Sequence, residues 1–271
     1  MSADGHTGTA DGARARGATY ALMAWALRYP SMDVLDVLRD ARLWQSAESP
    51  ADAPSGQDGG RLPNLLTDLK RRATVADAQG LQQTHSRLFG HTVRGSCPPY
   101  ELEYGRSEII QQAAELADVA GFYEAFGVRQ TDDSHERADH AAVECEFMAV
   151  LAAKEAYALQ QADHAALDVC RQAQQSFLAD HLGQWMPALA RRIAEADRDG
   201  FYGALGRLAG DFLAAECRGL GVTCGPTFLE LRPVDPTVDA SMSCGADHAV
   251  AAGRPDQLIQ IGVNPGLREK S

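Results

Sequence analysis

Apolar residues recur at intervals of three and four along most of this chain, a spacing that lines them up on one face of an α-helix. Proline and glycine interrupt the pattern between segments, as at Pro30, Gly90 and Gly200. Helices are predicted at residues 19–29, 31–38, 62–73, 76–89, 107–126, 143–159, 165–182, 185–196 and 200–220. Nothing before Gly221 alternates like a β-strand. We therefore predict an all-α fold in which the helices pack as a single bundle.

The same pattern divides the chain into three parts. Residues 1–17 are small and polar and lack the apolar segment of a secretory signal, which predicts a disordered tail on a cytoplasmic protein. Residues 18–221 form the helical domain. Residues 222–271 contain two alternating stretches, 227–232 and 257–262, with proline and glycine between them. They predict either a short hairpin or an extended tail against the bundle, and the extended tail is favoured.

Composition narrows the classes of function. The chain is 45% hydrophobic and 23% charged, which is ordinary for a soluble globular protein. Its net charge of -12 disfavours nucleic-acid binding, because phosphates need positive charge. No apolar run approaches the roughly 20 residues that cross a bilayer, so no membrane insertion is expected. The six cysteines contain no CxxC pair, which predicts reduced thiols rather than a disulfide framework or zinc ribbon.

One stretch is unusually polar for the start of a buried helix. Residues 135–146 hold two histidines and four carboxylates within twelve positions, and an apolar helical run follows directly. Ser134 or Asp139 is the expected N-cap of that helix. A cap accounts for Asp139, but not for His140 beside it or for Glu144 at the start of the burying face. The stretch is therefore a candidate working surface.

A metal site is the enzymatic interpretation of this stretch. On a helix His140 and Glu144 project together, and His135 lies close by in the preceding loop. Asp139 stands where an HExxH motif needs its second histidine, and no Glu-x-x-His pair occurs on another helix. We therefore expect no metal or other cofactor. The alternative hypothesis stays a metal-dependent enzyme using His135, Asp139, His140 and Glu144.

A second informative loop follows Cys97. Pro98 and Pro99 hold the backbone extended and cannot continue a helix, so they present Tyr100 and Glu101 on a stiff support. An aromatic ring beside a carboxylate suits an arginine-bearing peptide, through stacking and bidentate hydrogen bonds. A simple helix-to-helix turn with Tyr100 in the core is the other interpretation.

Four motifs together resemble one family. Residues 136–140 read Glu-Arg-Ala-Asp-His and resemble the E-P-x-D-H signature of the TorD/DmsD/NarJ family of redox-enzyme maturation chaperones. Residues 143–148 resemble its V-E-L-E-F-M helix, and residues 98–101 its P-P-Y-E-S segment. Residues 177–185 and 201–202 resemble its F-L-x-x-H-L-x-x-W and F-Y pattern. Two departures stand out: Arg137 replaces the signature proline, and Leu102 replaces the serine.

The resemblance spans roughly residues 19 to 220 and implies a TorD-like all-helical chaperone, not an enzyme. Such a protein binds the apo catalytic subunit of a molybdenum-cofactor oxidoreductase, often through its twin-arginine signal peptide. It holds this subunit until the molybdopterin cofactor is inserted. The resemblance leaves open a monomer or a helix-swapped dimer.

The resemblance also implies a leader-binding site. Asp139 and His140 match the family's site, and Tyr100 and Glu101 line the same groove. Glu136 and Glu144 are further carboxylates suited to an arginine pair, which prefers charge-assisted, bidentate hydrogen bonds. The predicted peptide-binding residues are Tyr100, Glu101, Glu136, Asp139, His140 and Glu144.

Overall fold

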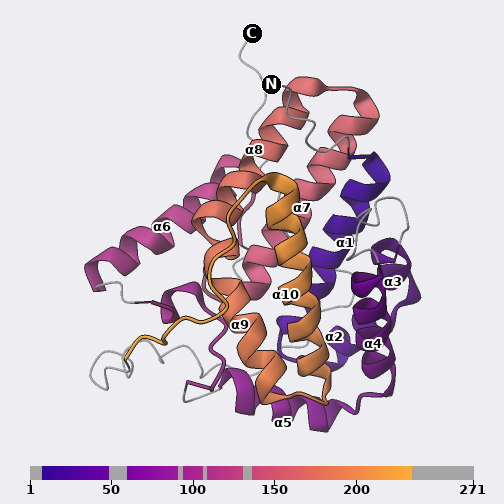
Figure 1. The fold of residues 1–271 in the computed structure, drawn as a ribbon, viewed down its shortest axis with the longest axis vertical. Helices are drawn as coiled ribbons and strands as arrows, with labels where there is room; N and C mark the ends of the chain where they lie inside the picture. The colour runs from indigo at the N-terminus through magenta and orange to yellow at the C-terminus, as the bar shows by residue number, and fades with distance from the viewer. Residues whose placement is uncertain (1–7, 49–59, 91–93, 106–108, 131–135, 234–271) are drawn as a thin grey trace.

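The computed structural model describes residues 8–48, 60–90, 94–105, 109–130 and 136–233. Within these ranges the regular structure is helical and there are no β-strands, only isolated bridges (Figure 1). The predicted all-α class is confirmed. None of the helices in these ranges is both long and apolar enough to cross a membrane.

The helices follow one another with mostly short connections. Their bounds are α1 Ala10–Leu27, α2 Met32–Arg39, α3 Ala41–Ala47, α4 Arg61–Val75, α5 Ala78–Phe89, η2 Glu101–Glu103 (a 3-10 turn), α6 Ile109–Ala125, α7 Ala141–Gln161, α8 His164–Asp180, α9 Leu182–Ala196 and α10 Phe201–Leu220. Helix α3 has no counterpart in the sequence prediction. It forms because Asp40 caps it and because Trp44 is buried, with its indole donating to the Leu38 carbonyl at 2.8 Å.

The first helix begins earlier than predicted. Residues 10–17 were expected in a disordered tail, but α1 starts at Ala10, where Thr9 accepts a hydrogen bond from the Gly12 amide. Arg16 explains the extension, because its guanidinium pairs with the buried carboxylates of Glu155 on α7 and Glu216 on α10. The prediction was therefore wrong for residues 10–17, and residues 1–7 lie outside the described ranges.

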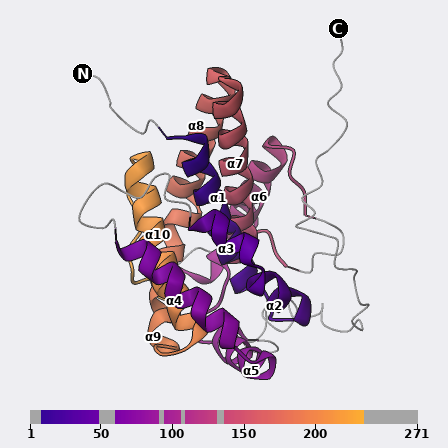
Figure 2. The ribbon, with the colours of Figure 1, turned by 90° about the vertical axis from the view of Figure 1, so that its right-hand side faces the viewer.

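The core is built on α7. It packs between α1 and α8, while α9 and α10 form a neighbouring pair (Figures 1 and 2). Helix α1 runs antiparallel to α7, since Arg28 pairs with Glu146 and Arg16 with Glu155. Large apolar side chains fill the space between the helices, and their burial is the main stabilising term. The largest of them include Tyr20, Met23, Phe147, Met148, Phe177 and Tyr202.

After α10 the chain continues as an extended segment, residues 222–233, here called the strap. In Figure 1 it crosses α9 toward η2. Arginines of α9 donate to it, Arg191 to the Thr227 carbonyl at 2.8 Å and Arg192 to the Leu229 carbonyl at 2.9 Å. The choice between a hairpin and an extended tail stays a prediction, because residues 257–262 lie beyond the described part of the chain.

Candidate functional site

The two polar stretches singled out in the sequence lie side by side. The Glu101 amide donates to the Asp139 carbonyl at 2.9 Å, and the Ala141 amide donates to the Pro99 carbonyl at 2.8 Å. These bonds form an antiparallel bridge between Tyr100 and residue 140. The proline-rich loop, residues 97–105, is thereby fixed against the start of α7.

Asp139 is completely buried and already binds an arginine. Its carboxylate accepts two hydrogen bonds from the Arg137 guanidinium, at 2.9 and 2.6 Å, and one from the Leu102 amide at 3.2 Å. The same guanidinium lies over the Tyr100 ring, 4.9 Å from its centre. A fork of two charge-assisted bonds under an aromatic ring is a strong geometry for a guanidinium. We call Tyr100, Glu136, Arg137 and Asp139 the arginine site.

The outer wall of the arginine site is formed by Tyr100 and Glu136. The Tyr100 hydroxyl donates to a Glu136 carboxylate oxygen at 3.0 Å. Burial and the neighbouring Glu136 charge raise the pKa of Tyr100, so the hydroxyl stays a donor at neutral pH. The Glu136 side chain is 44% exposed, which leaves its carboxylate open to solvent.

His140 is the N-cap of α7, a role that the sequence prediction gave to Ser134 or Asp139. Its Nδ1 accepts from the Ala142 amide at 3.0 Å, whereas the Asp139 carboxylate turns toward Arg137. The cap prediction was therefore wrong for Asp139, and Ser134 lies outside the described residues. Burial lowers the pKa of His140 and favours the neutral ring. With Nδ1 as acceptor, the proton sits on Nε2, 3.7 Å from Glu136.

Glu144 lies behind the site and does not reach the surface. It is fully buried, and one carboxyl oxygen accepts from the Trp185 indole at 3.1 Å. Its other oxygen has no hydrogen-bond partner among the described residues. Burial, and then the charge of Glu101, raise its pKa well above the usual range. Glu144 therefore does not line a groove directly in this structure, and its predicted peptide contact remains a prediction.

Glu101 points to the other side of the loop, toward α8 and α6. Both of its oxygens lie 3.3 Å from Nδ1 of buried His181, whose Nε2 lies 3.3 Å from the Asp118 carboxylate. Burial raises the pKa of Glu101, against the opposing effect of His181. Burial also disfavours the charged imidazole, but the bond to Glu101 and the charges of Glu101 and Asp118 outweigh it and raise the pKa of His181. The loop is thus clamped by an ion pair on this side.

Sequence comparison with known proteins places this chain in a family. Residues 57–191, which contain the arginine site, match the model of the nitrate reductase delta subunit family. The chain is 33% identical over 159 residues to a chaperone protein TorD from Vibrio cholerae, covering 56% of this chain and 68% of the relative. The chain belongs to the TorD/DmsD/NarJ family of maturation chaperones. The resemblance carried by the four motifs is confirmed.

Two further relatives of the TorD/DmsD/NarJ family carry more specific names. The selenate reductase assembly chaperone protein of Thauera selenatis is 31% identical over 119 residues, which are 44% of this chain and 56% of that protein. The chlorate reductase assembly chaperone protein of Ideonella dechloratans is 34% identical over 91 residues, 34% of this chain and 43% of that protein.

The metal alternative receives no support from these TorD-like relatives or from the geometry. The polar groups of Asp139, His140 and Glu144 point to different partners: Arg137, the Ala142 amide and Trp185. His135 lies outside the described residues. Across the described ranges, no group of three or more His, Cys, Asp or Glu side chains is arranged to hold a metal ion.

Sequence reasoning missed two parts of this TorD-family site. It noted Arg137 only as a departure from the signature proline. In the structure, the Arg137 guanidinium donates hydrogen bonds to the Asp139 carboxylate. It gave no role to His181, although this residue lies within one of the family-like motifs. The available signal was the four-residue spacing of His181 and Trp185, which both contact the proline-rich loop, through Glu101 and Tyr104 respectively.

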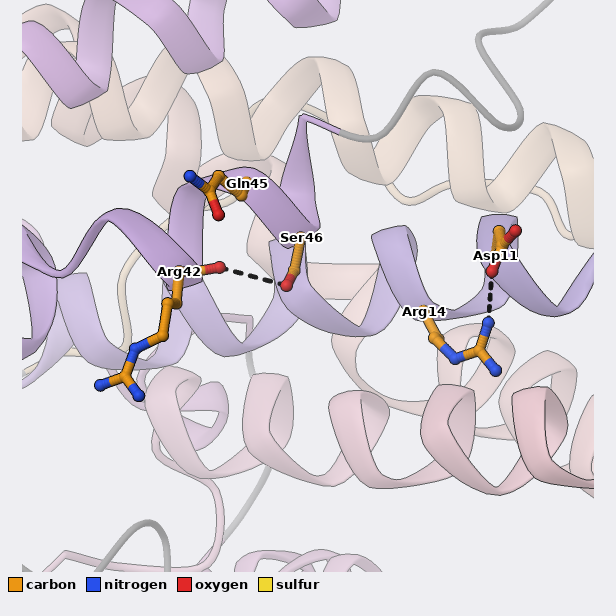
Figure 3. Close-up of a pocket in the computed structure, with 5 residues that line it drawn as sticks. All are labelled: Asp11, Arg14, Arg42, Gln45 and Ser46. Atoms are coloured by element: carbon orange, nitrogen blue, oxygen red, sulfur yellow. Dashed lines mark hydrogen bonds and ion pairs between the residues drawn. The ribbon is translucent and has the colours of Figure 1, made fainter.

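A separate surface hollow lies between α1 and α3 (Figure 3). Its polar side chains are paired with each other or with near neighbours: Arg14 with Asp11, Arg42 with Asp40, and Ser46 with the Arg42 carbonyl. It shares no residue with the arginine site. These pairings leave it weakly equipped to hold a polar ligand.

Proposed function

We propose that this chain is the dedicated cytoplasmic maturation chaperone of one DMSO-reductase-type molybdoenzyme. It binds the apo catalytic subunit and assists cofactor insertion before export. The chain is a chaperone and not an enzyme, in keeping with relatives named as TorD and as reductase assembly chaperones. These names support a reductase catalytic subunit as the client.

The polar part of the client contact is proposed at the arginine site, where a twin-arginine leader binds. The observation that carries this proposal is the Arg137 guanidinium, held by Asp139 and covered by Tyr100. A leader arginine offers the same planar fork, so it competes with Arg137 for the same carboxylate. The second arginine of the leader pairs with the exposed Glu136.

The remaining predicted residues are proposed to act from behind this surface. His140 starts α7 and faces Glu136, Glu101 clamps the loop to His181, and Glu144 anchors Trp185 beneath it. They set the position of Tyr100 and Asp139 rather than contacting the first arginine. The chain acts as a monomer or a helix-swapped dimer, which sedimentation at several protein concentrations distinguishes.

The site is tested with a fluorescent leader peptide and three variants of the chain. Asp139→Asn keeps the shape but removes the charge, and Glu136→Gln does the same at the exposed wall. Because a hydrogen bond to a charged group contributes about 1.5–3 kcal/mol, we expect Asp139→Asn to weaken binding about tenfold or more. Asp168→Asn is the matched control, since this exposed aspartate of α8 loses the same charge away from the site. Equal affinity of Asp139→Asn and the parent chain contradicts the site assignment.

The function itself is tested by measuring at which stage of enzyme maturation the chain is bound to its client. The tagged chain is expected to capture the precursor of a molybdoenzyme subunit and to be missing from the mature enzyme. A chain that stays in the mature complex at one copy per enzyme is a structural subunit, and that result overturns the chaperone proposal. A leader peptide with two lysines in place of the arginines is expected to bind more weakly, because lysine lacks the planar fork.

A further inference from the structure

The end of α10 brings two cysteines together. Gly221, at φ 67°, terminates the helix in the left-handed conformation, and the Val222 amide returns to the Cys217 carbonyl at 2.8 Å. This reversal folds Cys224 back onto the last turns of α10. The Sγ atoms of Cys217 and Cys224 lie 2.8 Å apart. The sequence predicted only reduced thiols here, because the six cysteines contain no CxxC pair.

The two thiols differ in exposure and in acidity. Cys217 is buried, whereas Cys224 is partly exposed at the start of the strap. When Cys224 ionises, the Cys217 thiol donates to its sulfur, and this hydrogen bond, with help from Arg218, lowers the pKa of Cys224 to about 7. The same bond and burial raise the pKa of Cys217. The pair therefore combines an accessible thiolate with a protonated partner in contact.

The other described cysteines form a natural comparison. Cys97, Cys145 and Cys170 are all buried, and burial raises the pKa of each thiol. Such thiols are poor nucleophiles and behave as small apolar side chains. Among the described cysteines, reactivity toward a small oxidant is therefore concentrated at Cys224, with Cys217 placed to complete the reaction.

We propose that Cys217 and Cys224 form a reversible intramolecular disulfide, with a low-molecular-weight disulfide such as oxidised glutathione as the oxidant. Closing the bond needs the sulfurs to move together from 2.8 Å to about 2.05 Å, a shift of less than about 1 Å.

The reaction is a two-step thiol–disulfide exchange. The Cys224 thiolate attacks one sulfur of oxidised glutathione, forms a mixed disulfide and releases one glutathione thiolate. Cys217 then loses its proton to water and attacks the Cys224 sulfur, releasing the second glutathione thiolate. Two protein thiols are oxidised, and one glutathione disulfide is reduced to two thiols.

The bond has a structural consequence beyond α10. Cys224 is at the start of the strap, whose far end holds the proline-rich loop through Gly105 N to Glu230 O at 3.0 Å and Arg232 N to Glu103 O at 2.9 Å. Oxidation fixes the near end of the strap covalently, while these bonds hold the far end. We expect the oxidised chain to show slower amide exchange over residues 225–232 than the reduced chain.

The test uses the full native chain in glutathione buffers of increasing oxidised fraction, followed by alkylation and digestion. Trypsin does not cut at Arg232 because Pro233 follows, so a second cleavage after Glu230 is needed to separate Cys224 from Cys244. We expect free thiols to fall from six to four, and one cross-linked peptide pair carrying Cys217 and Cys224. Dithiothreitol reverses both changes.

Three variants separate this pair from the other thiols. Cys217→Ser is expected to trap a stable glutathione adduct on Cys224, and Cys224→Ser to leave Cys217 unmodified. Cys170→Ser is the control and keeps the cross-link. A parent chain that gives only a glutathione adduct, a Cys224–Cys244 link or no reaction overturns the proposal. A disulfide that leaves exchange over residues 225–232 unchanged overturns its effect on the strap.

Discussion

Two buried carboxylates of this protein each hold an arginine, yet they do so in different ways. Glu155 on α7 binds Arg16 on α1, 139 positions away in the sequence, and the Arg16 side chain is 15% exposed. Asp139 binds Arg137, only two residues away, and the Arg137 side chain is 32% exposed. The first pair joins helices that are distant in sequence. The second closes a local loop and leaves its arginine accessible.

The difference separates a structural ion pair from an exchangeable one. Removing Arg16 breaks contacts among α1, α7 and α10, because Glu216 of α10 shares the same guanidinium. Releasing Arg137 breaks its hydrogen bonds to Asp139 but separates no helices, because both residues lie in the same loop before α7. The same pair of chemical groups therefore joins helices of the bundle in one place and, on the proposed function, forms a replaceable contact in the other.

The largest expected effect concerns Arg16, whose ion pairs join α1 to α7 and α10. Arg16→Met removes the cation from buried Glu216 and leaves Glu155 with Arg171, so we expect the free energy of unfolding to fall by about 3 kcal/mol or more. Urea denaturation measures the change. Arg14→Met is the control on the same helix, because its pair with Asp11 is exposed and contributes less than about 1 kcal/mol. Equal losses in the two variants contradict the distinction.

The next largest effect concerns Arg137, the partner of Asp139. Arg137→Ala is expected to lower the free energy of unfolding by less than Arg16→Met does, because the Arg137 side chain is 32% exposed and its removal opens the Asp139 carboxylate to water. The same variant is expected to bind the leader peptide several-fold more tightly, since no internal guanidinium competes for Asp139. Arg137→Lys lies between the parent and the alanine variant, because an ammonium lacks the bidentate fork. Weaker binding by Arg137→Ala shows that Arg137 belongs to the binding surface itself.

A smaller effect concerns Glu144, a third buried carboxylate, which is bonded to Trp185 rather than to an arginine. The folded-state pKa of Glu144 is raised, so its contribution to stability is present at acid pH and is lost as pH rises from about 4.5 toward that raised value. Glu144→Gln keeps an acceptor for Trp185 and removes this titration. We expect the variant to lose less stability than the parent chain between pH 5 and 8, measured by urea denaturation. Identical pH profiles show that Glu144 does not titrate on unfolding.

The smallest expected effect concerns salt. Leader binding at the arginine site, whose Glu136 carboxylate is exposed, is expected to weaken several-fold between low and high ionic strength, since mobile ions screen exposed charges. The stability difference between Arg16→Met and the parent chain is expected to change little over the same range, because that pair is buried. A salt-insensitive leader affinity contradicts an electrostatic contact at Glu136 and Asp139.

Much of the fold was predictable because helical periodicity is a local property. Helix α3 was missed because its seven residues are too few to establish a period, and because its stability depends on the burial of Trp44. The start of α1 was missed for a different reason. Residues 10–17 contain small and polar residues, and the partners of Arg16 lie on α7 and α10, so no local pattern predicts its burial.

The candidate site, too, was predictable only in part. The proline-rich loop and the stretch before α7 were identified from residue types and motif order. Three contacts depend on tertiary packing and could not be predicted. The two stretches bond to each other, Arg137 donates to Asp139, and His181 pairs with Glu101. The sequence placed Glu144 at the start of a burying face and proposed it as a peptide contact, and only the packing of Trp185 against it reveals its full burial.

Trp185 gives the molecule a built-in optical probe. Its indole is bonded to Glu144 and lies 5.3 Å, centre to centre, from the Tyr104 ring of the proline-rich loop. The other tryptophans, Trp25 and Trp44, are in α1 and α3. Replacing both with phenylalanine leaves Trp185 as the one tryptophan, and its emission, excited where tyrosine does not absorb, follows displacement of the loop in real time. Client capture then becomes visible without a label on either protein.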